Sequence, residues 1–281
     1  MLDLRFLLAV SRPRFCLFIL GPYLVGLAAG ASTAAELTSL TAIVFGIYFL
    51  FPANLMIYGV NDAYDFATDR LNPKKRDYEL LVKPEAHRPL LWTIAVLNGP
   101  FIIAAYFVAP YTLPSLVGFV FFSLDYSAPP IRAKAIPILD SIFNVLYVYP
   151  GAFAYQMLTG EFPPWAAFGA AALWTMAMHA YSAIPDIEAD REAGVNTVAT
   201  LLGKNGTLFY CLAAWVAAAA LSYQYLGYLS IVLGAVYTFL ILLSFVGSGR
   251  ERLFAVYRYF PLVNSTAGFI LFWWVAAKFL I

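Results

Sequence analysis

The stretch that decides the fold reads Asn61-Asp62-Ala63-Tyr64-Asp65-Phe66-Ala67-Thr68-Asp69, and it ends a long apolar run that begins near Leu40. If the helix predicted for this run continues through the stretch, Asp62, Asp65 and Asp69 share one face, with Asn61 beside them. Three carboxylates within two turns repel one another, so a bare cluster costs stability. A divalent cation reverses that cost, and Mg²⁺ suits hard oxygen ligands. A solvated helix end is the alternative interpretation.

A second acidic cluster, Asp186-Ile187-Glu188-Ala189-Asp190, follows another apolar run at 165–184. Asp186 and Asp190 are one helical turn apart and therefore share a face of a helix. One acidic cluster is weak support for a metal site. Two clusters, each at the end of an apolar helix, predict convergence on a single metal-bound diphosphate group.

The composition indicates a membrane protein. Of the 281 residues, 62% are hydrophobic and 12% are charged, and the mean hydropathy is +0.77, which excludes an ordinary soluble fold. The net charge of +1 gives no reason to expect a nucleic-acid partner. Cys16 and Cys211 lie in apolar runs, which favours small apolar side chains over a disulfide or a thiolate metal site. We expect one all-α membrane domain over residues 1–281, without a cleavable signal peptide.

Nine transmembrane helices are predicted, because a helix needs about 20 apolar residues to cross a bilayer. Their approximate limits are 14–31, 41–60, 90–109, 112–125, 137–158, 164–184, 207–224, 228–247 and 260–280. The fourth is short and contains Pro114, and its fusion with the third would leave eight.

The placement of lysine and arginine favours nine helices over eight. With a cytoplasmic N-terminus, all the basic residues except Lys278 fall on the cytoplasmic side, whereas eight helices would scatter them over both faces. Both acidic clusters then lie at the cytoplasmic ends of the second and sixth helices, which run in the same direction. We therefore expect a multi-pass integral membrane protein, in the cell membrane if the source is prokaryotic, with its active site facing the cytoplasm.

Basic residues accompany both clusters. Arg70, Lys74, Lys75 and Arg76 follow the first, Arg191 and Lys204 follow the second, and Arg132 and Lys134 lie between them. Carboxylates that hold Mg²⁺ beside arginine and lysine donors suit a diphosphate. Cytoplasmic topology alone is the alternative explanation for each basic residue, and Lys74, Lys75 and Lys83 are equally suited to contact with anionic membrane lipid.

A diphosphate site beside a lipid-facing cavity predicts an isoprenyl diphosphate as substrate. Mg²⁺ and basic side chains make the diphosphate a better leaving group, so that the allyl–oxygen bond breaks to an allylic carbocation. A bundle with 17% aromatic residues keeps water from that cation and offers it cation–π attraction. An electron-rich lipophilic acceptor then attacks.

These motifs resemble those of the UbiA superfamily of intramembrane prenyltransferases. The resemblance covers nearly the whole chain and rests on Asn61-Asp62-x-x-Asp65-x-x-x-Asp69, on Asp186-x-x-x-Asp190, and on Tyr126-Ser127-x-Pro129-Pro130-x-Arg132-x-Lys134. It implies a helical bundle with a cytoplasmic cap over the active site, and Mg²⁺ as the cofactor.

The resemblance also implies roles for individual residues. The implied metal ligands are Asp62, Asp65, Asp69, Asp186 and Asp190, and the implied catalytic residues are Asp62, Asp65, Asp186 and Tyr126. The expected diphosphate-binding residues include several of the basic residues named above. They are Asn61, Arg12, Arg70, Asn72, Arg76, Arg132, Lys134, Arg191 and Lys204. Tyr126 and Lys134 belong to the loop that caps the diphosphate, and Gly194, Thr197 and Gly203 shape the loop after the second motif.

Within the superfamily, the run from Asn54 to Lys75 resembles the carotenoid branch, the lycopene elongases. This resemblance implies transfer of a five-carbon unit from dimethylallyl diphosphate to lycopene or a related carotenoid, with the final cation quenched by proton loss or by water. Prenylation of an aromatic quinone precursor is one alternative. An ion-coupled membrane transporter is another, although transporters place such acids near the bilayer midplane. The sequence leaves the oligomeric state open.

Three polar residues inside the apolar runs are candidates for the acceptor cavity. Asn54 and Tyr58 precede Asp62 on its predicted helix face, and His179 lies two turns before Asp186, where it is placed to act as a base. Hydrogen bonding between helices explains Asn54 and Tyr58 equally well, and a lone histidine in a membrane helix is more often a hydrogen-bonded structural group. Asp140 is interpreted as a helix-start carboxylate.

Overall fold

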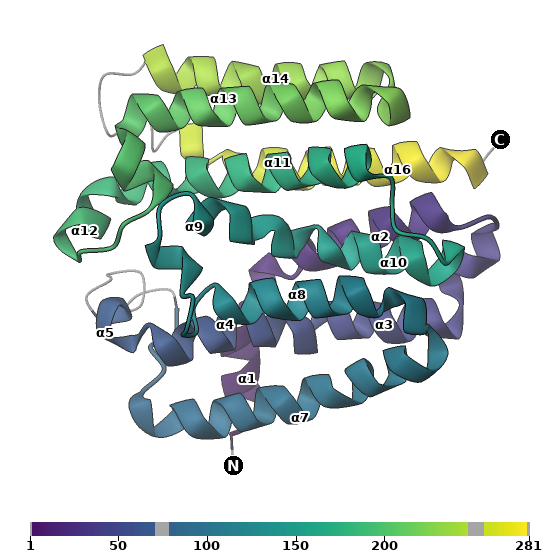
Figure 1. The fold of residues 1–281 in the computed structure, drawn as a ribbon, viewed down its shortest axis with the longest axis horizontal. Coiled ribbons are helices and arrows are strands. Elements are labelled where there is room, and N and C mark those ends of the chain that lie inside the picture. The colour runs from purple at the N-terminus through teal and green to yellow at the C-terminus, as the bar shows by residue number, and fades with distance from the viewer. Residues whose placement is uncertain (1, 71–78, 247–255, 280–281) are drawn as a thin grey trace. The chain divides into compact units, whose positions relative to one another are not determined.

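The computed structural model describes residues 2–70, 79–246 and 256–279 (Figure 1). These residues form helices joined by turns and loops, and none of them lies in a strand. The predicted all-α fold is therefore confirmed. The chain forms two compact units: unit 1 is Met1–Arg132, Tyr149–Glu161 and Phe272–Ile281, and unit 2 is Ala133–Val148 and Phe162–Leu271. The single domain expected over residues 1–281 stays a prediction.

Unit 1 contains most of the N-terminal helices. Its α-helices are α1 (Leu4–Ser11), α2 (Leu17–Gly30), α3 (Leu40–Leu50), α4 (Pro52–Tyr64), α5 (Phe66–Asp69), α7 (Pro84–Val108), α8 (Leu113–Asp125) and α10 (Tyr149–Thr159). Short 3₁₀ helices, η1 (Pro13–Phe15), η2 (Ala34–Thr38), η3 (Pro110–Thr112) and η7 (Ala277–Phe279), complete this unit.

Unit 2 contains the second acidic motif and the long C-terminal helices. Its elements are η4 (Ala133–Ala135), α9 (Leu139–Ile142), η5 (Phe143–Tyr147), α11 (Trp165–Ala183), η6 (Ile184–Asp186), α12 (Ile187–Glu192), α13 (Val198–Leu226), α14 (Tyr228–Val246) and the larger part of α16 (Phe260–Ala276). The α13 helix is kinked at Gly203, whose φ of 66° is open to glycine but costly for other residues.

Six helical segments of the described residues are long and apolar enough to cross a membrane. They are Pro13–Gly30, Leu40–Tyr64, Pro84–Val108, Val198–Leu226, Tyr228–Phe245 and Phe260–Phe279. These match the first, second, third, seventh, eighth and ninth predicted spans. The chain is therefore an integral membrane protein.

The other three predicted spans take different forms, so the number nine stays unconfirmed. The fourth is the 13-residue α8, too short to cross a bilayer alone. The fifth is divided into α9, η5 and α10. The sixth is the 19-residue α11, which has sufficient length but contains polar residues such as His179 and Ser182.

An aromatic cluster and a close helix crossing hold unit 1 together. Phe49 packs edge-on against both Phe119 and Phe153, with ring centroids 5.5 Å apart in each case. The α2 and α10 helices touch through glycines, since a Cβ added to Gly26 would lie 2.0 Å from the carbonyl oxygen of Gly151. Small residues at such a crossing let two membrane helices approach closely.

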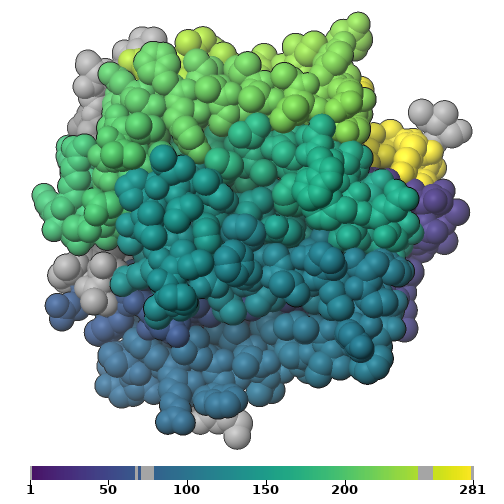
Figure 2. Space-filling view, viewed as in Figure 1, coloured from purple at the N-terminus to yellow at the C-terminus, as the bar shows by residue number. Residues whose placement is uncertain are grey.

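Unit 2 packs around Trp215, which is 1% exposed. Its ring lies against Tyr237 with a centroid distance of 4.7 Å, and its Nε1 donates to the carbonyl oxygen of Trp174 at 3.3 Å. Outside the two cores many large apolar side chains are exposed. Phe107 of α7 is 76% exposed and Tyr228 of α14 is 78% exposed, and both helices lie at the surface in Figure 2. Such exposure suits side chains that face lipid.

Candidate active site

The first acidic motif lies at a break between two helices. The α4 helix ends at Tyr64, Asp65 follows with φ −107° and ψ 7°, and α5 begins at Phe66. The expected uninterrupted helix through Asp62, Asp65 and Asp69 is therefore wrong at Asp65. The amide of Asp65 still donates to the carbonyl oxygen of Asn61 at 3.0 Å, and that of Asp69 donates to Asp65 at 2.8 Å, so the interruption is local. Asp62 and Asp65 are buried, at 2% and 0% exposed.

Arg12 is the principal partner of Asp62. Its guanidinium donates to the Asp62 carboxylate at 2.6 Å, lies 3.2 Å from the carboxylate of Glu79, and covers the ring of Tyr58 at 4.7 Å. Burial lowers the pKa of Arg12, but attraction to Asp62 and Glu79 outweighs burial, so that this pKa lies above its ordinary value. Arg12 is therefore a permanent cation at the first motif.

The segment after α8 supplies two further partners. Arg132 lies 3.3 Å from the carboxylate of Asp65, and the amide of Asn61 donates to the hydroxyl of Ser127 at 2.9 Å. Arg12 and Arg132 share a positive φ of 49°, a backbone conformation rare outside glycine and asparagine. Each of the two buried aspartates thus has an arginine partner. Tyr126, which follows α8 directly, is half-buried.

The second motif repeats the helix break in unit 2. The α11 helix ends at Ala183, and Asp186 follows in η6 with φ −96° and ψ 0°, nearly the conformation of Asp65. Both aspartates occupy the bridge region, which active-site residues often adopt. Pro185 contributes to the break, since it lacks the amide hydrogen that would continue the hydrogen bonds of α11. Asp190 lies in α12.

The surroundings of the second motif include a residue that the sequence did not suggest. Burial and the charge of Asp186 raise the pKa of Tyr257, which places this tyrosine in the electrostatic field of the motif.

The loop after the second motif is held by local contacts. Arg191 donates to the carbonyl oxygen of Thr200 at 3.0 Å. Gly194 has a φ of 70°, and Thr197 accepts a bond from the amide of Thr200 at the start of α13. Gly194 and Thr197 thus lie in the loop before α13, whereas Gly203 lies at the kink inside that helix.

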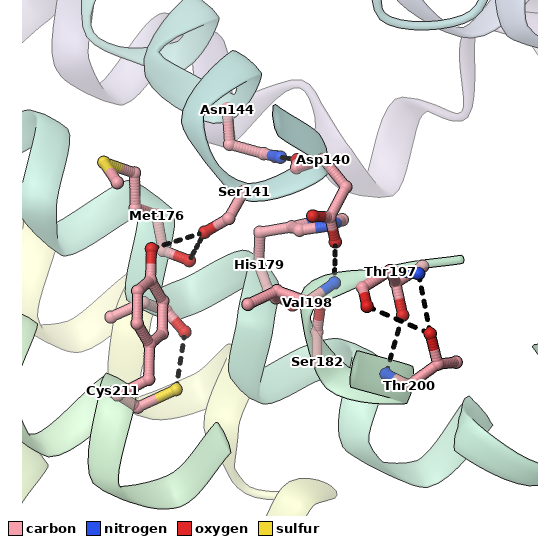
Figure 3. Close-up of polar contacts among 12 residues, drawn as sticks. Asp140, Ser141, Asn144, Met176, His179, Ser182, Thr197, Val198, Thr200 and Cys211 are labelled. Carbon is pink, nitrogen blue, oxygen red and sulfur yellow. Dashed lines mark hydrogen bonds and ion pairs between the residues drawn. The ribbon is translucent and has the colours of Figure 1, made fainter. Parts of the chain in front are cut away.

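A buried polar group behind the second motif involves Asp140 of α9, whose carboxylate lies beside His179 of α11 and the amide of Val198 (Figure 3). Asp140 was interpreted as a helix-start carboxylate. Asp140 does lie in the first turn of α9, and its side chain also caps a second helix, because Oδ2 accepts the bond from Val198 at the start of α13.

The other predicted residues have less distinctive surroundings. Asn54 is buried and its amide donates to the carbonyl oxygen of Ser11, a contact between helices, while Tyr58 lies beneath Arg12. Arg70 is exposed beyond α5, and Lys134 and Lys204 are half-buried in η4 and α13. Asn72 and Arg76 lie outside the described residues, as do Lys74 and Lys75. The roles assigned to all of these residues stay predictions.

Sequence reasoning missed Glu79, Ser127 and Tyr257. Glu79 contacts both Arg12 and Arg14, the latter at 2.5 Å. An acidic residue beside a basic loop was the available signal for Glu79, whereas Ser127 stood inside the quoted loop motif without a role. Tyr257 had no sequence signal, since tyrosine is common in this chain.

Within the described parts of the chain, no three His, Cys, Asp or Glu side chains gather as a ready-made metal site. The two acidic motifs belong to different units, and their convergence stays a prediction. The donor set nevertheless fits Mg²⁺, because the buried carboxylates of Asp62 and Asp65 are hard oxygen ligands and Mg²⁺ needs only one or two of them beside substrate phosphates.

Comparisons with known proteins agree with these features. The sequence matches the UbiA prenyltransferase family over residues 19–276. It is 41% identical over 271 residues to the lycopene elongase/hydratase of Haloferax volcanii, covering 95% of this chain and 87% of that protein. It is 43% identical over 216 residues to the lycopene elongase/hydratase of Halobacterium salinarum, covering 77% of this chain and 78% of that protein.

The fold is similar to that of a UbiA homolog from Archaeoglobus fulgidus bound to DMAPP and Mg²⁺. The TM-score is 0.71, the sequence identity is 21%, and the match covers 95% of this chain and 98% of that chain. The fold, the charged site and the relatives together define an intramembrane prenyltransferase, an enzyme and not an ion-coupled transporter. The chain belongs to the UbiA prenyltransferase family.

Proposed function

We propose that the chain transfers the allyl group of dimethylallyl diphosphate to lycopene or a related carotenoid, with Mg²⁺ as cofactor. The observation that carries the prenyl-transfer chemistry is the pairing of buried Asp62 and Asp65 with Arg12 and Arg132. The carotenoid acceptor is supported by the names of the relatives at 41% and 43% identity. The five-carbon donor is supported by the DMAPP held by the fold neighbour.

In this proposal the acidic residues hold the metal and the basic residues hold the diphosphate. Asp62, Asp65, Asp69, Asp186 and Asp190 are the ligands, and bound Mg²⁺ would neutralise negative charge that develops on the leaving diphosphate. Arg12 and Arg132 donate to diphosphate oxygens once metal and substrate compete for their carboxylate partners, because guanidinium binds either anion. Asn61, Arg70, Lys134, Arg191 and Lys204 are the further diphosphate-binding candidates.

The apolar surroundings then control the fate of the allyl cation. Breaking the carbon–oxygen bond sends its electron pair to the diphosphate and leaves an allylic cation that water would capture as the alcohol. Apolar and aromatic side chains exclude that water, and the acceptor alkene supplies the electron pair of the new carbon–carbon bond. We place the N-terminus and the active site on the cytoplasmic side, as the distribution of lysine and arginine favours.

The test is to incubate membranes that contain the full chain with Mg²⁺, labelled dimethylallyl diphosphate and lycopene. Extracted lipids are separated by chromatography and analysed by mass. We expect a polyene heavier by one or two five-carbon units. Label released only as the free alcohol would contradict the acceptor, whereas transfer of label to an added quinone precursor and not to lycopene would favour the aromatic alternative.

A further inference from the structure

His179 is a candidate base from its sequence position, but its pairing with buried Asp140 has no role in the function proposed above. Asp140 is 0% exposed, and its Oδ2 lies 3.4 Å from Nε2 of His179. The same oxygen accepts the amide hydrogen of Val198 at 3.0 Å. Figure 3 shows the carboxylate from α9 between the imidazole from α11 and the first residue of α13. Three helices of unit 2 therefore meet at one carboxylate.

Burial makes the negative charge of the Asp140 carboxylate costly in free energy. A buried charge is costly unless it is paired and hydrogen-bonded. The Val198 amide supplies one bond at a helix N-terminus, where the helix dipole favours negative charge. Among the described residues, Oδ1 of Asp140 accepts no hydrogen bond. An imidazole 3.4 Å away compensates a negative charge best when it carries a proton.

Neighbouring polar groups hold the pair in place. The side-chain amide of Asn144 donates to the carbonyl oxygen of Asp140 at 2.7 Å. The hydroxyl of Ser141 donates to the carbonyl oxygen of Met176 at 2.8 Å and contacts the hydroxyl of Tyr210 at 3.0 Å. These bonds tie α9 to α11 and α13 on both sides of the carboxylate (Figure 3). The segment that carries the carboxylate is thus fixed against the neighbouring helices.

Part of the His179 side chain is exposed. The side chain of His179 is 18% exposed, while its Nε2 atom, which faces Asp140, is buried. The exposed area therefore belongs to the part of the side chain away from Asp140. Histidine is the side chain most often used as a general base.

The proposed reaction needs a proton acceptor. When the alkene of the acceptor attacks the allylic cation, a carbon–carbon bond forms and a tertiary cation remains on the neighbouring carbon. That cation ends by losing a proton from an adjacent carbon, or by binding water that then loses a proton. Either route releases one proton inside an apolar bundle.

We propose that His179 accepts this proton, and that Asp140 is the positioning residue that orients its imidazole and balances the resulting positive charge. The proposal rests on the proposed function. The electron pair of the broken C–H bond, or of the water O–H bond, stays with the product, and the proton forms the imidazolium. His179 lies in α11, and Asp186 follows seven residues later, after that helix has ended at Ala183. At the rise of an α-helix, seven residues span about 10 Å, which leaves room for a five-carbon group beyond a diphosphate.

The first experiment compares His179→Gln with the wild type in membranes given Mg²⁺, labelled dimethylallyl diphosphate and lycopene. Diphosphate release, labelled alcohol and labelled polyene are measured separately. We expect labelled polyene to fall by about a hundredfold or more, the usual contribution of a general base. Diphosphate release should fall far less, with the label diverted to the alcohol. His87→Gln, which changes the only other histidine of the chain, should behave as the wild type.

The second experiment separates the charge of Asp140 from its role as a helix cap. In Asp140→Asn the side-chain carbonyl still accepts the Val198 amide but carries no charge, whereas Asp140→Ala loses both functions. We expect Asp140→Asn to melt near the wild-type temperature and to divert label to the alcohol as His179→Gln does. If capping is its only role, Asp140→Asn keeps its polyene yield and only Asp140→Ala melts earlier.

The outcomes distinguish a failure of the proposed function from a failure of the proposed role of His179. A wild type that makes no heavier polyene contradicts the proposed function, before any variant is considered. A wild type that makes it, together with a folded His179→Gln that makes it equally well, overturns the present proposal. If His179→Gln loses its melting transition, the partition of label in Asp140→Asn decides alone.

Discussion

The guanidinium of Arg12 lies 2.6 Å from the carboxylate of Asp62, although the two residues are 50 positions apart in the chain. Their side chains are 14% and 2% exposed. A buried ion pair of this kind adds little to the free energy of unfolding compared with an apolar pair of similar size. Removal of one partner is nevertheless destabilising, because the other charge stays buried without it. The contact therefore joins stability to function, because it links a predicted metal ligand to a predicted diphosphate-binding residue.

Arg12→Ala should impair both folding stability and transfer. We expect a loss of about 3 kcal/mol in the free energy of unfolding, because the buried charge of Asp62 loses its partner at 2.6 Å. Prenyl transfer should fall by about a hundredfold as a cation at the diphosphate is lost. Thermal melting in detergent and the transfer assay measure the two effects. The control is Arg5→Ala, which removes an exposed arginine. Equal behaviour of the two variants would contradict the prediction.

Glu79→Gln should act on substrate affinity. Glu79 holds Arg12 at 3.2 Å and Arg14 at 2.5 Å, so its neutralisation loosens Arg12 without removing the contact with Asp62. We expect KM for the allylic diphosphate to rise several-fold while kcat stays near the wild-type value, the pattern of lost uniform binding. Glu85→Gln, an exposed glutamate nearby, should leave both constants unchanged. A fall in kcat alone would speak against this role.

Asp65→Asn and Asp186→Asn should each abolish transfer in a folded protein. Asparagine preserves size and hydrogen bonding but lacks the charge that binds Mg²⁺, and we expect losses of about a thousandfold in rate, as for other transition-state electrostatic contacts. Rates with labelled donor and melting curves are the measurements. Glu188→Gln changes an exposed acid within the second motif and serves as the control. Wild-type rates in both aspartate variants would remove the basis of the proposed site.

Removal of divalent cations should stop the reaction at its first step. With a chelator in excess, we expect neither diphosphate release nor labelled product, and weaker binding of labelled dimethylallyl diphosphate to the membranes. Added Mg²⁺ should restore all three, because carboxylates and phosphates then share the cation. Full diphosphate release in the presence of chelator would show that the arginines suffice without metal.

Gly26→Ala should destabilise unit 1 through the crossing of α2 and α10. The added methyl would lie 2.0 Å from the carbonyl oxygen of Gly151, so the helices must separate. We expect a cost of about 1–3 kcal/mol, typical of overpacking. Gly21→Ala, in the same helix, adds a methyl with no atom within 4 Å and is the matched control. Melting in detergent distinguishes them, and equal melting temperatures would contradict the close crossing.

Several features of the site were predictable because they depend on short stretches of sequence. The acidic motifs at 61–69 and 186–190 stand at the ends of apolar runs, and the structure places both at helix ends. Pro185 marks the second break in the sequence itself. The break at Asp65 was not predicted, because no proline or glycine follows Tyr64 and helical spacing suits the three aspartates equally well.

The partners of the charged groups were beyond sequence reasoning. Glu79 was one acid among several in a polar stretch, and only the folded chain brings it to Arg12. Asp140 lies in the first turn of α9, as the sequence suggested, but nothing in the sequence indicated that its carboxylate also caps α13, which begins 58 residues later. In both cases the local interpretation was reasonable, and a distant helix supplied the stronger contact.

The sequence by itself determined that this chain is an all-helical membrane enzyme with two acidic motifs, because hydropathy, helical spacing and charge placement are properties of neighbouring residues. Only the tertiary structure decided that Arg12 pairs with Asp62 and Glu79, that Arg132 pairs with Asp65, and that Asp140 joins His179 to α13. The physical reason is that a buried charge must find a counter-charge or a donor wherever the packing of helices provides one, and that packing is set by contacts between residues far apart in the chain.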